Sequence, residues 1–330
     1  MQAVDFMGQY LDWKRLISST LSKEIMNEAV PEGAKGIVLA GMGGSGIVSD
    51  IVYEMLKQAV NVPLTIVKDF ELPRWARKGW VVIGISYSGN TMETIEVIRK
   101  ALNRGCFVSA VTSGGKLAEL MIREGYPLIK IPGGRAPRSS LPALLTGVLR
   151  LLEMLSVERR LSEYVEKAMY ILDDEKFIEM WSEKLVKHLS SKIPVWVVNQ
   201  KYYPLALRAK DEFNENSKTL SLINVYPESA HNDIVGWERW FGPVASVVFR
   251  EEKDEILAYI AKYMQEQGVI AEEILLEKAT SPDAYLKNVL LWSQIVGVAS
   301  VKTAINRGIN PAETRSILDY KEFIKKLRSK

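Results

Sequence analysis

The sequence predicts an α/β protein built from two doubly wound parallel sheets in tandem, each flanked by helices. Short β-branched runs alternate with amphipathic segments of helical spacing along both halves of the chain. Parallel strands joined by helices form right-handed crossovers, which place helices on both faces of a sheet. The 330 residues, of which 47% are hydrophobic, suffice for two domains of ordinary size with real cores.

The first half begins with a helical segment and continues as alternating strands and helices. Residues 2–30 have helical spacing and end at Pro31, which predicts a helical cover over the first sheet. The next elements are a strand at 36–41, a helix at 47–58, strands at 62–68 and 80–86, a helix at 92–104, a strand at 106–112, a helix at 116–123 and a strand at 127–131. Cys106 opens an apolar run, where we expect a buried residue rather than a nucleophile.

The second half repeats this alternation after a long helical region at 140–188. We place the domain boundary inside that region, near Ser156. The elements that follow are a strand at 194–199, a helix at 204–214, strands at 219–225 and 244–249, a helix at 253–267, a strand at 269–276 and helices at 281–307 and 311–327. Asn310 followed by Pro311 is a favourable N-cap and first-turn pair, so the last helix is expected to begin there.

Two strands of the first half end in turns rich in glycine and small hydroxyl side chains. The first turn is Gly41-Met42-Gly43-Gly44-Ser45-Gly46, and the second is Ser86-Tyr87-Ser88-Gly89-Asn90-Thr91. Each turn leads into a helix, whose N-terminus carries unpaired N–H donors and a partial positive charge. We therefore expect the two turns to bind one phosphate or carboxylate together, although neither contains Lys or Arg.

Two other interpretations of these turns stay open. Gly41, Gly43 and Gly46 match the G-x-G-x-x-G pattern of dinucleotide-binding proteins, and Asp69 could then bind a ribose. That interpretation gives the hydroxyl-rich second turn no role. Both turns could also be ordinary connections in which Ser and Thr cap helices. A Walker loop is excluded because no Gly-Lys-Ser/Thr follows.

The composition argues against several function classes. Charged residues make up 25% of the chain and the formal net charge is +3, so no strong field favours nucleic acid or an acidic membrane. No apolar run reaches the ~18 residues that span a bilayer, and the N-terminus lacks a signal pattern. With one cysteine and two histidines, a disulfide within the chain is impossible and zinc is not expected. We expect a cytoplasmic protein without metal or cofactor.

One histidine and one acidic residue of the second half stand out by position. His231 lies in a loop after a predicted strand, where parallel-sheet proteins place their sites, whereas His188 lies among charges on a helix and is expected to be solvated. Glu215 lies between Asn214 and Asn216 at the end of a helix, where the macrodipole disfavours a carboxylate. An acid in such a place indicates a function. The spacing leaves three acidic alternatives open, namely Asp211, Glu212 and Glu228.

Five motifs, taken in order, carry a resemblance to a known family. They are GMGGSG at 41–46, SYSGNT at 86–91, PRS at 137–139, FNEN at 213–216 and PESAHN at 227–232. Together they resemble the archaeal bifunctional phosphoglucose/phosphomannose isomerase family, which is built from two sugar isomerase (SIS) domains. The resemblance covers essentially the whole chain. With the boundary placed above, it implies an N-terminal SIS domain at 1–155, a C-terminal SIS domain at 156–330, and a metal-free homodimer whose active site lies at the subunit interface.

The resemblance also implies roles for individual residues. Glu215 would move a proton between C2 and C1 of the sugar through a cis-enediolate, and Arg138 would stabilise the negative charge of that intermediate. His231 of the neighbouring subunit would help to open the sugar ring. The implied ligands of the sugar phosphate are Gly44, Ser45, Ser86, Ser88 and Thr91.

The last helix and an arginine-containing loop extend the implied site. The family has a Thr and a Lys seven residues apart that close the site, and Thr314 and Lys321 match that spacing. Seven residues are about two helical turns, so both side chains would share one helix face. Residues 133–138 contain a second arginine, Arg135, which could take the role of Arg138 or contact phosphate.

We therefore expect an aldose–ketose isomerase that interconverts glucose 6-phosphate, and mannose 6-phosphate, with fructose 6-phosphate. Three alternatives are a non-catalytic sugar-phosphate sensor, an aminosugar-phosphate isomerase and a dinucleotide oxidoreductase. A sensor would need no base, whereas this chain contains Glu215, His231 and Lys321.

Overall fold

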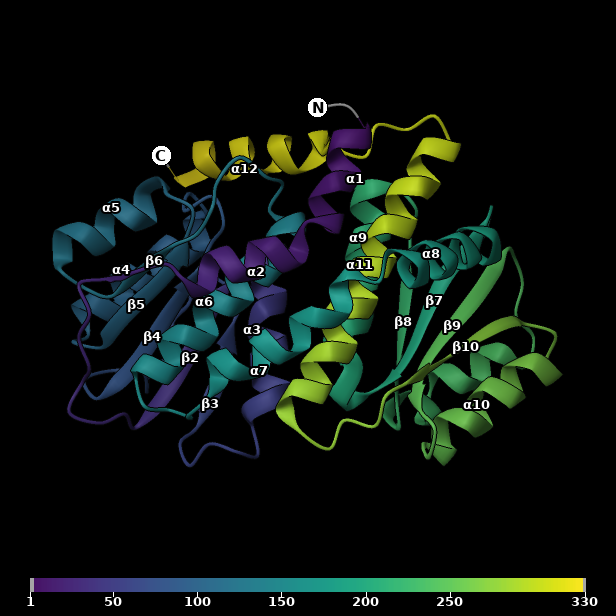
Figure 1. Cartoon of the computed structure of the whole chain (residues 1–330), viewed down its shortest axis with the longest axis horizontal. Coiled ribbons are helices and arrows are strands. Elements are labelled where there is room, and N and C mark those ends of the chain that lie inside the picture. The colour runs from purple at the N-terminus through teal and green to yellow at the C-terminus, as the bar shows by residue number, and fades with distance from the viewer. Residues whose placement is uncertain (1–2, 329–330) are drawn as a thin grey trace.

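Two sheets, one from each half of the chain, lie on either side of a layer of helices (Figure 1). The structure is a computed structural model that describes residues 3–328. Within this range the first sheet has six strands in the order β1-β6-β5-β4-β2-β3, and the second has four in the order β10-β9-β7-β8. Only β1 pairs antiparallel to its neighbour, so the predicted pair of parallel sheets flanked by helices is confirmed.

The strands agree with the predicted apolar runs, with ends that differ by a few residues. Those of the first sheet are β1 (Ile25–Met26), β2 (Gly36–Gly41), β3 (Leu64–Val67), β4 (Trp80–Ile85), β5 (Phe107–Thr112) and β6 (Leu128–Lys130). Those of the second sheet are β7 (Ile193–Asn199), β8 (Leu222–Tyr226), β9 (Val244–Glu251) and β10 (Ile270–Leu276). The short strand β1 is an addition, because the sequence indicated helix as far as residue 30.

The helices fill the connections between strands and form the layer in the middle of the molecule. In the first half they are α1 (Ala3–Leu11), α2 (Trp13–Leu21), α3 (Gly43–Leu56), α4 (Met92–Asn103), α5 (Gly115–Glu124) and α6 (Leu141–Met154). In the second half they are α7 (Leu161–Ala168), α8 (Glu175–Leu189), α9 (Tyr203–Asn216), α10 (Glu255–Glu266), α11 (Pro282–Asn306) and α12 (Arg315–Arg328). The long helical region predicted at 140–188 is therefore three separate α-helices.

In both sheets the first three parallel strands are arranged in the same order, and this arrangement positions the candidate site. The first parallel strand of each half, β2 or β7, is flanked by the second strand on one side and the third on the other. The chain therefore reverses its direction of winding between β2 and β4 and again between β7 and β9. Open α/β sheets bind ligands at such switch points, beyond the carboxyl ends of the strands. The two turns rich in glycine and hydroxyl side chains, at 41–46 and 86–91, follow β2 and β4 at that edge.

The core explains why the strands read as continuous apolar runs. Ile37 and Leu39 of β2 face the middle layer of helices, and Val38 and Ala40 face the outer helices α4 and α5, so both faces of the strand are buried. The middle cluster also includes Trp196 of β7, so one hydrophobic core draws on both halves of the chain. The division into domains at residue 156 stays a prediction.

The N-terminal helices differ in part from the predicted cover over the first sheet. α2 lies beside α6, where Arg150 Nη1 donates to the carbonyl oxygen of Thr20 at 3.0 Å. α1 instead packs against α11 of the second half, where Gln294 Nε2 donates to the carbonyl oxygen of Tyr10 at 2.9 Å. A Cβ on Gly297 would lie 2.4 Å from the Tyr10 ring, so only glycine allows this close approach.

The predicted start of the last helix at Pro311 is wrong, because α12 begins at Arg315. The Asn310 side chain accepts from the amide of Ala312 at 3.0 Å and closes a local turn instead of capping a helix. A helix from residue 311 would need the Pro311 carbonyl for the amide of Arg315, yet Arg138 Nη2 donates to that carbonyl at 2.7 Å. Tertiary contacts therefore override the N-cap signal.

Helix α11 is the central helix of the second half. By length and apolar composition it could cross a membrane, but 83% of its apolar window is buried inside the fold. Helices α7, α8, α9 and α1 pack around it, so the protein core accounts for its apolar character.

Candidate active site

The two hydroxyl-rich turns lie side by side at the carboxyl edge of the first sheet. β2 and β4 are neighbouring parallel strands in which Gly41 pairs with Ile85, so the turns that follow them start at the same level. Ser45 Oγ accepts from the backbone amide of Tyr87 at 3.2 Å and ties one turn to the other. The two turns therefore lie in contact, and their binding of one phosphate stays a prediction.

The second turn presents its hydroxyl groups through a compact backbone. Ser86 Oγ lies 3.0 Å from Thr91 Oγ1 and accepts from the Gly89 amide at 3.1 Å, so these hydroxyls are held in place before any ligand arrives. Ser88 is exposed and accepts from the Asn90 amide at 3.2 Å. Gly89 has a φ of +63°, and a Cβ there would lie 1.8 Å from the carbonyl oxygen of Gly114, so the turn requires glycine.

The first turn touches the segment that carries Arg138. A Cβ on Gly44 would lie 3.5 Å from the Cα of Arg138, which places the backbones of the two segments in direct proximity. Arg138 begins a short 3₁₀ turn, Arg138–Ser140, and its side chain is buried. The backbone of Arg138 therefore lies beside the first turn, although the turns themselves contain no cation.

The Arg138 guanidinium crosses to the second half of the chain. Its Nη1 donates to Glu215 Oε2 at 3.1 Å, its Nε donates to Asn216 Oδ1 at 2.6 Å, and its Nη2 donates to the Pro311 carbonyl. The guanidinium also lies over the ring of Phe6, 4.8 Å from the centroid. Three acceptors and an aromatic face fix the plane of the arginine, which a lysine could not reproduce.

Glu215 is the acid that the fold brings to Arg138. Burial raises the pKa of Glu215 above its ordinary range, and the positive charge of Arg138 offsets part of that increase. A carboxylate with a raised pKa, partly shielded from water and beside a cation, is suited to accept a proton. The alternatives are placed differently, because Glu212 is fully buried and Glu228 is exposed.

A buried polar network that the sequence did not reveal lies behind Arg138 and Glu215. Asn216 Nδ2 lies 2.7 Å from Glu212 Oε2, 2.8 Å from Ser300 Oγ and 3.0 Å from Tyr10 Oη, and its two N–H donors are shared among these three oxygens. Tyr10 in turn donates to Glu212 at 2.6 Å, and Arg208 pairs with Glu212. These residues come from α1, α9 and α11, so no local pattern in the sequence could have linked them.

Arg135 has a structural position that differs from that of Arg138. Its guanidinium contacts the Gln9 carbonyl and lies 3.1 Å from Asp12 Oδ2. Both partners belong to the N-terminal helices or their junction, so Arg135 connects that segment to the loop at 133–138. It is Arg138, and not Arg135, that contacts Glu215.

The two histidines occupy different environments. His188 is not solvated as predicted: its ring is half-buried, and Nε2 lies 2.9 Å from the Ser246 carbonyl of β9. Burial lowers the pKa of His188 below its usual range. His231 ends the 3₁₀ turn Glu228–His231 after β8 and is exposed, and its side chain makes no hydrogen bond to another residue within 3–328. No side-chain hydrogen bond or ion pair joins His231 to Glu215 within residues 3–328.

Thr314 and Lys321 lie at the start and in the middle of the last helix. The Thr314 carbonyl accepts from the amides of Ile317 and Leu318, so this residue immediately precedes the helix. Lys321 is exposed and forms no ion pair with any described residue. Several large apolar side chains of α12 are also exposed by more than half, namely Leu318, Tyr320, Phe323 and Leu327.

Comparisons with known proteins identify the family of this chain. Residues 179–324 match the family described as the bacterial phospho-glucose isomerase C-terminal SIS domain. The bifunctional phosphoglucose/phosphomannose isomerase of Aeropyrum pernix is 34% identical over 94% of this chain and 96% of its own. The chain belongs to the bifunctional phosphoglucose/phosphomannose isomerase family. The D-glucosamine-6-phosphate 4-epimerase of Sulfolobus acidocaldarius is also similar, at 28% identity over 95% and 96% of the two chains.

A solved structure shows the same fold as this family member. The C-terminal domain of glucosamine-fructose-6-phosphate aminotransferase from Francisella tularensis superposes with a TM-score of 0.72, covering 93% of this chain and 98% of that one. The sequences are 14% identical, so the likeness concerns the fold alone.

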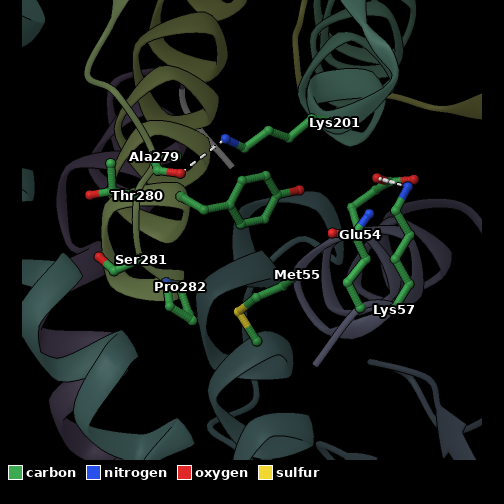
Figure 2. A pocket seen from close by; sticks show the side chains of 10 residues that line it. Glu54, Met55, Lys57, Lys201, Ala279, Thr280, Ser281 and Pro282 are labelled. Carbon is green, nitrogen blue, oxygen red and sulfur yellow. Dashed lines mark hydrogen bonds and ion pairs between the residues drawn. The ribbon is translucent and has the colours of Figure 1, made fainter. Parts of the chain in front are cut away.

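A separate cavity lies at the C-terminal end of α3. The turns with hydroxyl side chains lie near the other end of this helix. The cavity has a volume of about 460 Å³ and opens between the end of α3, the start of α11 and Lys201 (Figure 2). Glu54 is ten residues beyond Gly44, roughly 15 Å along the helix, so the cavity is not part of the site. Its two lysines are already paired, Lys57 with Glu54 at 2.6 Å and Lys201 with Glu251 at 2.8 Å.

Proposed function

We propose that the protein is a metal-independent aldose–ketose isomerase that interconverts glucose 6-phosphate and mannose 6-phosphate with fructose 6-phosphate. The observation that carries this proposal is the 3.1 Å contact between Arg138 and Glu215 beside the turn that contains Ser45. In this proposal Glu215 is the base, Arg138 is the cation, and the nearby turns bind the phosphate, as the chemistry requires. The name of the Aeropyrum pernix relative supports the choice of substrates.

The phosphate of the substrate would bind at the edge of the first sheet. Ser45, Ser86, Ser88 and Thr91 would supply hydroxyl groups there, and Gly44 would contribute its backbone amide at the start of α3. The N-terminus of α3 adds unpaired N–H donors and a partial positive charge, which stabilise a phosphate without lysine or arginine.

Glu215 would act on the C1–C2 edge of the open-chain sugar. Its carboxylate takes the proton from C2, the electron pair of that bond forms the C1–C2 double bond, and the carbonyl oxygen becomes negatively charged. Glu215 then returns the proton to C1, while a second proton passes from the C2 hydroxyl to the C1 oxygen. Arg138 stabilises the charged oxygen, an electrostatic contribution of the kind that dominates such steps.

A homodimer would complete the site. His231 would open the sugar ring from the neighbouring subunit, and Lys321 with Thr314 would close over the substrate. Two features support this arrangement: His231 is exposed in the single chain, and α12 exposes Leu318 and Phe323 by 61% and 59%. A second copy is the simplest partner for these exposed apolar side chains of α12. A cytoplasmic location completes the proposal and is supported by the burial of the apolar α11 inside the fold.

The test of the reaction is a coupled assay for fructose 6-phosphate formed from each aldose, with and without a chelator. The proposal expects activity on both aldoses that the chelator leaves unchanged. Activity on neither substrate would refute the isomerase, and loss of activity with the chelator would refute the metal-free mechanism. A Glu215→Gln variant serves as the negative control, with Glu228→Gln as its matched exposed counterpart.

The shared site has its own test. Glu215→Gln and His231→Ala subunits are mixed under conditions that exchange subunits. If each site uses Glu215 of one subunit and His231 of the other, half of the mixed dimers' sites regain both residues, and activity returns to roughly a quarter of the wild-type level. If both variants are inactive and their mixture also shows no activity after subunit exchange has been verified, the shared site is contradicted.

An aminosugar phosphate is the second candidate substrate, because one relative of nearly equal length is named a D-glucosamine-6-phosphate 4-epimerase. The same purified protein is therefore incubated with glucosamine 6-phosphate, and the products are separated from the starting sugar. Turnover of glucosamine 6-phosphate together with inactivity on both hexose phosphates would favour this candidate. Binding of labelled NAD, tested in parallel, would instead favour the dinucleotide interpretation.

A further inference from the structure

Lys218 occupies a backbone position that its side-chain type does not favour. It lies one residue beyond Ser217, the C-cap of α9, and has a φ of +52°. This left-handed conformation brings Cβ close to the backbone, so glycine is the usual residue at the position that follows a C-cap. The presence of a lysine at this position indicates that its side chain has a role that offsets the backbone strain.

The ammonium group of Lys218 joins two segments that are distant in the sequence. Its Nζ donates to the carbonyl oxygens of Glu313 at 2.7 Å, Glu215 at 2.8 Å and Asn310 at 3.0 Å. A lysine has three N–H donors, so these three carbonyls use all of them. The fourth contact, to the Asn216 carbonyl, is longer at 3.4 Å.

One of these segments carries the proposed base and the other leads into the last helix. The Glu215 carbonyl belongs to the last turn of α9, where carbonyls have no partner inside the helix. Asn310 and Glu313 form the turn that precedes Thr314 and α12. Arg138 holds the same turn through the Pro311 carbonyl at 2.7 Å, so the turn is attached from two directions.

The charge of Lys218 also acts on the end of α9. A cation at a helix C-terminus interacts favourably with the partial negative charge of the exposed carbonyls. The charge of Lys218 therefore offsets part of the unfavourable field of the helix at Glu215. Burial of Glu215 already raises the pKa of that residue. Lys218 is exposed, and partial loss of solvent around its ammonium group lowers its pKa, with the nearby charge of Arg138 acting in the same direction.

We propose that Lys218 is a positioning residue that clasps the turn at 310–313 against the C-terminal end of α9, and so sets where Thr314 and α12 lie relative to Glu215. The effect on turnover rests on the proposed function, whereas the clasp itself does not. Lys218 does not act on the substrate in this proposal. It acts through the segment that would close the site.

The decisive variant is Lys218→Gly, which removes the ammonium group and relieves the left-handed strain together. We expect an unchanged or raised melting temperature, faster amide hydrogen exchange over 310–318, and a fall in kcat of about 10- to 100-fold, because small misplacements of closing groups are costly. The matched control is Ser156→Gly, since Ser156 has a φ of +55° one residue beyond the C-cap of α6. That control should match the wild type in exchange over 310–318 and in kcat.

A second variant, Lys218→Met, tests the same contacts of the ammonium group. Lys218→Met keeps the length of the side chain without its charge, and it should show the same faster exchange over 310–318. Unchanged exchange there in both variants would overturn the clasp. If the wild type is inactive on both hexose 6-phosphates, the proposed function fails, and the exchange measurement still decides the clasp because it needs no substrate.

Discussion

Nη1 of Arg138 lies 3.1 Å from Oε2 of Glu215, a contact between residues 77 positions apart that joins the loop after the first sheet to a helix of the second half. Each partner is held by other groups, the arginine by Asn216 and Pro311 and the acid by its place at the end of α9. The pair therefore exists before substrate binds. A preorganised cation beside a base lowers the barrier because no reorganisation is needed during the reaction.

Arg138→Ala should lower kcat by about 10²- to 10³-fold with little change in KM, because a group that stabilises only the charged intermediate affects turnover. Arg135→Ala should leave kcat near the wild-type value, since Arg135 contacts Gln9 and Asp12 instead of the acid. Steady-state kinetics of both variants on glucose 6-phosphate make the comparison. Equal losses of kcat would contradict the assignment.

The pH dependence of turnover should reflect Glu215. The base must be ionised, and its pKa is raised by burial, so the acid limb of the kcat/KM profile should lie above the pH of an ordinary glutamate. Arg138→Ala should move that limb to still higher pH, because the arginine lowers the pKa of Glu215. A limb at the pH of an exposed glutamate in both proteins would show that another group is the base.

The same shift predicts how stability changes with pH. Between the unfolded and the raised folded pKa of Glu215 the folded state binds more protons, so stability falls as pH rises through this window. Glu215→Gln removes the titration, and its melting temperature relative to wild type should therefore rise as the pH increases from the pKa of an ordinary glutamate through the raised pKa of Glu215. A difference that stays constant with pH would contradict the raised pKa.

Thr314→Gln should reduce turnover of mannose 6-phosphate more than turnover of glucose 6-phosphate. Acceptance of both C2 epimers requires the intermediate to rotate about its C2–C3 bond, and a larger side chain before α12 would obstruct that rotation. The measurement is the ratio of kcat/KM for the two aldoses in variant and wild type. Thr314→Ser is the conservative control, and equal losses on both sugars would count against this role.

Gly297→Ala should destabilise the fold by about 1–3 kcal/mol, because the added Cβ would lie 2.4 Å from the Tyr10 ring in a packed interface. Gly8→Ala in α1 is the matched control, since a Cβ there meets nothing within 4 Å. That control should be neutral or slightly stabilising, as alanine is a better helix former. Urea denaturation measures both, and equal stability of the two variants would contradict the packing argument.

The sequence predicted the sheets because their strands are buried on both faces. Runs such as Ile37 to Ala40 are apolar without interruption, which is the pattern of a parallel strand covered by helices on each side. The turns at 41–46 and 86–91 could also be predicted from the sequence, because glycine and hydroxyl residues directly follow the apolar runs. Local patterns of this kind carry both the fold class and the candidate phosphate ligands.

Contacts between distant residues could not be read in the same way. The start of α12 was misplaced because Arg138 and Lys218 take carbonyls of the turn at 310–313 that a helix would have used. His188 was misjudged because its partner, the carbonyl of Ser246, comes from another element. The network of Tyr10, Glu212 and Asn216 likewise unites three helices and has no counterpart in any single segment.

The docking of α1 on α11 has a consequence for synthesis of the chain. The Tyr10 carbonyl meets Gln294, 284 residues later, so the first helix leaves the ribosome long before its partner exists. At typical elongation rates the wait is roughly 15 to 60 seconds. Other native partners of this helix are made sooner, because Arg138 lies over the Phe6 ring and Glu212 accepts from the Tyr10 hydroxyl, so α1 gains its surroundings in stages as the chain is synthesised.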